Sequence, residues 1–106
     1  MKKTGTLAIE TLAAMPRATL RIHPNVGFEL GMMMTHHPVQ WFVQGTLQAF
    51  LQGHTSNPVA GAVELLNECP QETLQMAPSD WKNVGMPRQA VLLCDGDRLF
   101  LHPISS

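Results

Sequence analysis

The residues best able to do chemistry in this chain are its five histidines. Two histidines that share a metal on a helix usually stand four positions apart, because that spacing puts both rings on one face. His36 and His37 are adjacent instead, and the side chains of neighbouring residues diverge. His23, His54 and His102 are scattered at no ligand spacing. We therefore predict no metal site and interpret the histidines as surface and helix-start residues.

Nucleophilic and acid–base catalysis find little support in the pattern of serines and carboxylates. No serine has the Gly-x-Ser-x-Gly setting of a hydrolase nucleophile. Asp95 and Asp97 are spaced like a carboxylate pair, but they flank Gly96, and Asp-Gly is typical of a hairpin turn. Bulky residues between Gly27 and Gly31 exclude a phosphate-binding loop. The sequence predicts no catalytic residue and no cofactor, and it favours a non-enzymatic role, with enzymatic activity left open.

Charge is sparse and unevenly placed in this chain of 106 residues. Asp, Glu, Lys and Arg make up 14% of it, the net charge is −1, and 44% of the residues are hydrophobic. Disordered chains are richer in charge and nucleic-acid-binding proteins are more basic, so we expect neither class. The 34 residues from Leu30 to Val63 carry no formal charge. Glutamines, histidines and Pro38 interrupt this stretch too often for a membrane span.

The uncharged stretch predicts a central pair of helices. Pro38 suits a first helical turn, where its missing N–H would have had no partner. On a helical wheel of about 100° per residue, one apolar face is formed by Val39, Phe42, Val43, Thr46, Leu47 and Phe50. The other face carries Gln40, Gln44, Gln48 and Gln52, with Trp41 on the same side. A second helix is predicted from Pro58 to Cys69, and the short link at 53–57 makes the pair an antiparallel helical hairpin.

Strands are predicted on both sides of this helical hairpin. Residues 90–94 and 98–102 form a predicted β-hairpin at the C-terminal end, and 73–76 adds a strand. Near the N-terminus, 18–23 alternates with Leu20 and Ile22 inward. Two further segments, 4–15 and 28–34, fit either a strand or a helix.

Together these elements predict one α+β domain over residues 1–106. Its antiparallel sheet combines the N-terminal strands with the C-terminal β-hairpin, and the central helical hairpin packs against that sheet. We find no internal repeat in the sequence. Cys69 and Cys94 are interpreted as two buried free thiols, because two cysteines are too few for a disulfide scaffold. The N-terminal Met-Lys-Lys opening lacks a convincing cleavage pattern, so a cytoplasmic protein is expected.

The leading functional hypothesis is a self-associating interaction module, most simply a homodimer. An exposed indole among neutral amides needs cover, and tryptophan is enriched in interface cores from which charges are depleted. Flexible methionine side chains extend the same surface. The candidate interface residues are Trp41, Gln44, Gln48, Gln52, Met32, Met33 and Met34.

The alternative hypothesis is a small-molecule-binding protein with a pocket between the helical pair and the sheet. Methionines and aromatic rings would line this pocket, and histidines would supply its polar groups. The candidate pocket residues are His23, Phe28, His36, His37, Phe42 and Trp81. Nucleic acid and membranes are not expected partners.

Overall fold

The structure of the protein, a computed structural model, describes residues 1–42, 46–53 and 58–104. Most of the regular structure within these ranges is β-sheet. The strands are β1 (Lys2–Lys3), β2 (Leu7–Thr11), β3 (Thr19–Ile22), β4 (His36–Phe42), β5 (Val59–Leu65), β6 (Thr73–Met76), β7 (Gln89–Asp95) and β8 (Arg98–Ile104). The helices are short: α1 (Pro24–Glu29), α2 (Leu47–Leu51) and α3 (Pro78–Asn83).

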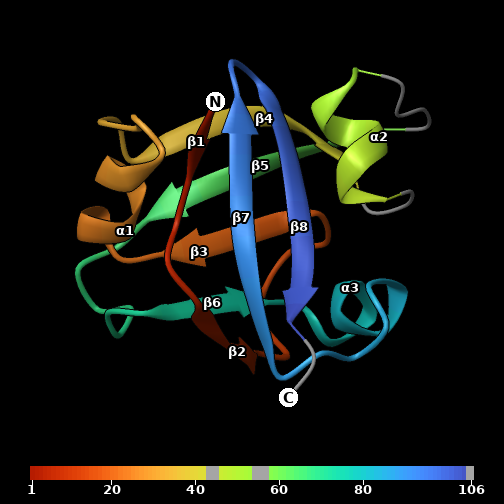
Figure 1. The fold of residues 1–106 in the computed structure, drawn as a ribbon. Helices are drawn as coiled ribbons and strands as arrows, with labels where there is room; N and C mark the ends of the chain where they lie inside the picture. The colour runs from red at the N-terminus through yellow and green to blue at the C-terminus, as the bar shows by residue number, and fades with distance from the viewer. Residues whose placement is uncertain (43–45, 54–57, 105–106) are drawn as a thin grey trace.

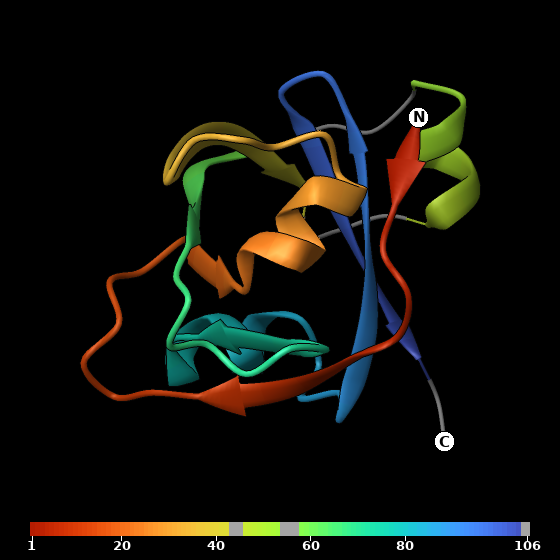
Figure 2. The same ribbon diagram turned by 90° about the vertical axis from the view of Figure 1, so that its left-hand side faces the viewer.

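The strands close into a seven-strand mixed barrel. Its order is β7-β2-β6-β3-β5-β4-β8, and β8 pairs with β7 to complete the ring. The β2–β6, β3–β5 and β4–β8 pairs are parallel, and the other pairs are antiparallel. Strand β1 pairs with β7 outside this ring. In Figure 1 β7 and β8 cross in front of β3, β5 and β6, and Figure 2 shows these two walls from the side.

The barrel interior is filled by alternate residues of the seven strands of the ring, as the two-residue period of a strand requires. Leu20 and Ile22 point inward on β3, while Arg21 between them is half-exposed. The fully buried side chains include Leu7, Leu20, Ile22, Trp41, Val63, Leu74, Met76, Leu92 and Leu99. The core therefore contains no charged side chain from the strands.

A smaller apolar cluster lies outside the barrel, beneath α2. Phe42, Leu93 and Phe100 follow or precede inward residues on their strands and so face the opposite side. Phe50 of α2 stacks on Phe100 with ring centroids 5.2 Å apart. The Arg98 guanidinium lies 4.8 Å from the Phe50 ring centroid, a cation–π contact. This cluster attaches α2 to the outer face of the barrel.

The barrel is built from two equivalent halves. A shift of 54 positions carries Ala8 onto Ala62 and Thr19 onto Thr73, and it also exchanges the two parallel ladders, Ala8↔Thr73 and Thr19↔Ala62. The same shift carries α1 onto α3. It matches the left-handed residues before β3 and β6, Ala18 (φ 59) and Glu72 (φ 62). The structure thus contains a pseudo-twofold repeat that the sequence analysis missed.

The methionine run marks where the halves differ in length. Gly31 and Gly85, which end their helices with φ of 75 and 92, are 54 positions apart. On the following strands, Val39 and Ala90 are equivalent because they pair with the equivalent residues Gly61 and Leu7, yet they are only 51 positions apart. The first half therefore has three extra residues between helix and strand, in the segment that contains Met32–Met34.

The predicted α+β architecture is wrong. Residues 36–42 form β4 and residues 59–65 form β5, so the central helical hairpin does not exist, and the sheet is a closed mixed barrel, not an antiparallel layer. The apolar residues of β4 fit a helical wheel, but they also alternate, with Val39 and Trp41 buried and Gln40 exposed. Partners distant in sequence, on β5 and β8, select the strand.

Gly61 shows why β5 cannot be read as a helix by periodicity alone. A Cβ at this position would collide with the carbonyl oxygen of Ala18, whose bond to the Ala62 N–H closes the ladder beside β3. Glycine is therefore required for close approach of two backbones, a strand feature. The same residue weakens a helix by roughly 1 kcal/mol relative to alanine.

Several local predictions are confirmed. Residues 89–95 and 98–104 form the C-terminal β-hairpin, with Gly96 at its turn in a left-handed conformation (φ 65). Strands at 19–22 and 73–76 lie where they were expected, and the N-terminal alternative resolves as strand β2. Segment 28–34 is the end of α1 and the loop after it. Cys69 and Cys94 are buried and free.

Candidate functional site

A cavity of about 210 Å³ lies beside the barrel, between α3, the loop before β3, and the paired ends of β4 and β5. Both halves of the chain contribute to it, because the loop before β3 belongs to the first half and α3 to the second. It is lined by Arg17, Ala18, Trp41, Val59, Asp80 and Asn83. We call it the Trp41 cavity.

Trp41 forms the inner wall of this cavity. It sits on β4, opposite Val59 on β5 and beside Leu99 on β8, and only 1% of its surface is exposed. Its indole Nε1 is buried and has no acceptor among the residues that the structure describes. A buried donor left unpaired costs about 1–3 kcal/mol. The described part of the chain thus places a hydrogen-bond donor in a cavity wall without supplying its acceptor.

Asp80 supplies a carboxylate to the same cavity. It is the third residue of α3, and its side chain is only 6% exposed. Its Oδ2 accepts a hydrogen bond of 2.7 Å from the Ala18 N–H. Ala18 has a left-handed backbone (φ 59), so this bond fixes a loop that alanine adopts at a cost. Asp80 therefore joins α3 to the loop that forms the opposite wall.

Arg17 and Asn83 are exposed residues at the rim of the cavity. The ion pairs of the described residues are Arg21–Glu64, His36–Glu64 and Arg98–Asp95. Within that part of the chain, neither Arg17 nor Asp80 has an ionic partner. The cavity therefore combines an unpaired cation, a buried carboxylate and an unpaired neutral donor.

A second cavity, of about 360 Å³, is shallower and lies near the N-terminus. It is lined by Met1, Lys2, Leu30, Gly31, Cys94, Asp95 and Gly96. The Cys94 thiol donates to the Gly96 carbonyl at 3.2 Å. Burial, reinforced by the Asp95 and Asp97 carboxylates, raises the pKa of this thiol. A thiol held protonated is a poor nucleophile and a poor metal ligand, so this cavity offers little reactivity.

A row of polar side chains crosses the barrel on registered neighbours of five strands. It runs through Glu10, Gln75, Arg21, Glu64 and His36. Gln75 donates to Glu10 at 2.6 Å, and Arg21 pairs with Glu64 at 3.2 Å. The Cys69 thiol covers part of this row by donating to the Arg21 carbonyl, and burial above all raises its pKa, with Glu10 adding to the effect. Arg21 Nε is buried and has no acceptor among the described residues, but the other contacts of the row join neighbouring strands, and we interpret it as a cross-strand network.

No group of three or more His, Cys, Asp or Glu residues within 1–42, 46–53 and 58–104 could hold a metal ion. Over the same ranges, no helix has the length and apolar character needed to cross a bilayer.

The predicted interface residues do not form one surface. Trp41 lies in the barrel core and is covered by the chain itself, and Met32 is also buried. Gln48 and Gln52 are exposed on and just after α2, whereas Gln44 lies outside the described residues. Met33 and Met34 are 82% and 63% exposed, near Phe28 of α1 at 72%. The exposed methionines are therefore separate from the glutamines.

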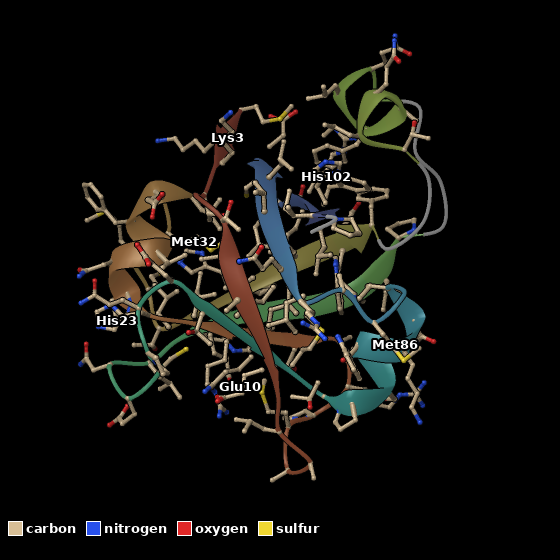
Figure 3. All side chains as sticks on the ribbon, turned by 60° about the horizontal axis from the view of Figure 1, so that its bottom comes forward. Lys3, Glu10, His23, Met32, Met86 and His102 are labelled. Atoms are coloured by element: carbon tan, nitrogen blue, oxygen red, sulfur yellow. The ribbon has the colours of Figure 1, made fainter. Side chains whose placement is uncertain are left out.

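The predicted pocket residues are likewise dispersed, and none of them lines either cavity. His23 caps α1 by accepting the Asn25 N–H, and His37 accepts the Met34 N–H. His36 is exposed beside Glu64, and Phe28 is exposed on α1. Phe42 belongs to the cluster under α2, and the Trp81 indole donates to the Pro87 carbonyl. Figure 3 shows that His23 and His102 lie well apart.

Sequence reasoning missed Arg17, Val59, Asp80 and Asn83. A pattern that could have revealed Asp80 is the internal repeat itself. When Thr19–Gly31 is aligned with Thr73–Gly85, the Thr-Leu pair, the helix-starting proline and the final glycine coincide, and Asp80 falls opposite Val26. A carboxylate at a position that its repeat fills with valine is a candidate for function.

No known protein family, curated protein or solved structure matches this chain. The geometry of the cavities is therefore the basis for any functional argument.

Proposed function

We propose that this protein binds a small polar molecule in the Trp41 cavity. The observation that carries the proposal is the buried Trp41 indole N–H, which has no acceptor in the described part of the chain. Buried polar groups are nearly always paired, so an orphan donor in a cavity wall suggests that a ligand atom completes it.

The rest of the cavity supports the same function. Val59 and Ala18 supply apolar surface, and Arg17, Asp80 and Asn83 supply polar groups, the mixture typical of ligand sites. Its volume of about 210 Å³ is below the ~300–1,000 Å³ of pockets for drug-sized ligands. The ligand is therefore a compact molecule.

Two tryptophans make this proposal directly testable. In a ¹⁵N–¹H spectrum each indole N–H gives its own signal, and Trp41→Phe or Trp81→Phe assigns them. A library of small neutral, anionic, cationic and zwitterionic metabolites is then added to the wild-type protein. The Trp41 signal should shift with a saturable dependence on one class of compound, while the Trp81 signal, already bonded to Pro87, stays in place. If no class moves the Trp41 signal, the proposal fails.

Self-association, the leading hypothesis from the sequence, stays a prediction with a changed location. Its support is the exposure of Phe28, Met33 and Met34, which all fall within residues 28–34, since clusters of large exposed apolar side chains are typical of interaction surfaces. Sedimentation at micromolar concentration tests it. A dimer that dissociates in Met33→Gln, and is unaffected by Gln48→Ala on α2, would support it; a monomer at all concentrations would contradict it.

A further inference from the structure

We infer that the ligand of the Trp41 cavity is a small zwitterion, with an ammonium and a carboxylate on one compact frame, as in a free amino acid with a small side chain. This inference rests on the proposed function and specifies the ligand class. Its basis is that the cavity wall carries one group of each charge, Asp80 and Arg17, with no ion pair joining them.

The ammonium is assigned from Asp80. Asp80 is 6% exposed, and among the described residues the donor to its carboxylate is the neutral Ala18 N–H, which bonds to Oδ2. A carboxylate has about four acceptor sites, and a buried charge is costly unless it is paired. A ligand ammonium within the cavity would supply both the missing donors and the missing positive charge.

The ligand carboxylate is assigned from Trp41 and Arg17. The indole N–H can only donate, and the guanidinium can only donate, so both require an acceptor. One carboxylate has two oxygens and can accept from a wall donor and from a rim cation together. The positive charge of Arg17, at the exposed rim of the cavity, also attracts an anionic group toward it.

Ligands with a single charge fit less well. A simple anion would satisfy Trp41 and Arg17 but would meet the Asp80 carboxylate, and a simple cation would leave the indole donor unpaired. A neutral amide could accept from Trp41 and donate to Asp80, but it would bring no counter-charge for either Asp80 or Arg17. The volume of about 210 Å³ admits a molecule of the size of alanine.

The test measures binding to Trp81→Phe protein, in which Trp41 is the remaining tryptophan, by titrating its fluorescence and its indole N–H signal. The probes are glycine and L-alanine as zwitterions, with acetate, ethylammonium and acetamide as partial mimics at the same ionic strength. Glycine or L-alanine should bind at least tenfold more tightly than each partial mimic. Equal or tighter binding of acetate, ethylammonium or acetamide would overturn the zwitterion assignment while leaving the proposed function standing. Absence of binding by all five would overturn the zwitterion assignment, and the metabolite library then decides the proposed function.

Two variants separate charge recognition from support of the fold. Asp80→Asn keeps an oxygen that can accept the Ala18 N–H but removes the charge, and Arg17→Gln removes the charge of an exposed rim residue. Each should weaken L-alanine binding about tenfold or more, as expected for loss of a charge-assisted contact. Lys82→Gln, an exposed cation on α3 that does not line the cavity, is the matched control and should bind normally. Unchanged affinity in Arg17→Gln would contradict the assignment even if Asp80→Asn failed to fold.

Discussion

The two halves of the barrel, residues 7–42 and 61–95, differ in side chains at positions where their backbones coincide. Leu7 is equivalent to Gly61, Met15 to Cys69, Val26 to Asp80, and Gly27 to Trp81. The first half is also three residues longer than the second, in the segment that contains Met32–Met34. The two halves thus share a backbone arrangement but pack different side chains at equivalent positions.

The comparison locates the polar chemistry at one of two equivalent places. The position of Asp80 is taken in the first half by buried Val26, that of Trp41 in the second by buried Leu92, and that of Arg17 by Gln71. The region equivalent to the Trp41 cavity therefore lacks the indole donor, the buried carboxylate and the Arg17 cation, and its charged residues are Glu72 and Glu29, at the positions of Ala18 and Asn83. The residues assigned to ligand binding therefore lie at positions where the two halves differ, and each of these differences can be tested by substitution.

The largest expected effect concerns α2, which has no counterpart after β7. Phe50 is fully buried between Phe42 and Phe100, so Phe50→Ala should lower the free energy of unfolding by about 3 kcal/mol. Chemical denaturation measures this change. Leu51→Ala, half-exposed on the same helix, is the control and should cost less than about 1 kcal/mol. Equal effects of the two would mean that the cluster under α2 does not stabilise the barrel.

The next effect concerns Gly61, where the equivalent residue is Leu7. A Cβ at position 61 meets the Ala18 backbone oxygen, which cannot rotate away like a side chain, so Gly61→Ala should destabilise by about 2 kcal/mol. Gly5→Ala is the matched control, because no atom lies within 4 Å of a Cβ placed there. Thermal unfolding of both variants measures the difference. A stable Gly61→Ala protein would show that the two backbones can separate at this point.

A smaller effect is expected when Asp80 is replaced by the residue of its repeat. Asp80→Val removes the acceptor of the Ala18 N–H and should cost about 1 kcal/mol, with part of that loss offset because a carboxylate no longer has to be buried. Asp80→Asn, which retains an acceptor, should be more stable than Asp80→Val. Denaturant melts compare the two. The reverse order would show that the Ala18 bond contributes nothing to stability.

The smallest effect concerns Cys69, whose equivalent is Met15, together with Cys94. Burial raises the pKa of both thiols above the ordinary value of 9.0, so above that pH the unfolded chain loses protons that the folded protein keeps. The stabilisation is complete below about pH 9 and is lost as pH rises, by less than about 1 kcal/mol per thiol at about pH 9.5. The chain has no tyrosine to titrate in this range.

Denaturant melts from pH 7 to 10 measure this dependence. Cys69→Ala should reduce the slope of stability against pH, and Cys69→Ala/Cys94→Ala should reduce it further. A slope that is identical in all three proteins would exclude the two thiols as the source of the alkaline loss.

The sequence correctly predicted a strand pair whose two members are close together in the chain. The hairpin of β7 and β8 was predicted because a turn containing Gly96 joins strands that pair with each other. Strand β4 was predicted as a helix because its neighbours, β5 and β8, are distant in sequence, and its apolar residues fit both periods. Trp41 was placed on an exposed face for the same reason: with the wrong period, an inward residue is turned outward.

The candidate site was beyond sequence reasoning for a different reason. Arg17, Asp80 and Asn83 are ordinary polar residues of loops and short helices, and nothing in their local pattern distinguishes them from surface residues. What makes them a site is that α3 of one half packs against the loop before β3 of the other. Recognition of the internal repeat would have predicted the proximity, because equivalent halves of a barrel must exchange equivalent contacts.

The exchange of parallel strands between the halves also dictates when the protein can fold. Strand β2 has no parallel partner until Thr73–Met76 has been made, and β3 has none until Ala62–Leu65 has been made. When only the first half of a growing chain has emerged from the ribosome, its apolar strands are therefore unpaired. They can pair only after the second half has been made. Such distant pairings slow folding and prolong the period in which edges are open to aggregation. We expect refolding to be slow for a protein of this size, and to be sensitive to chain concentration.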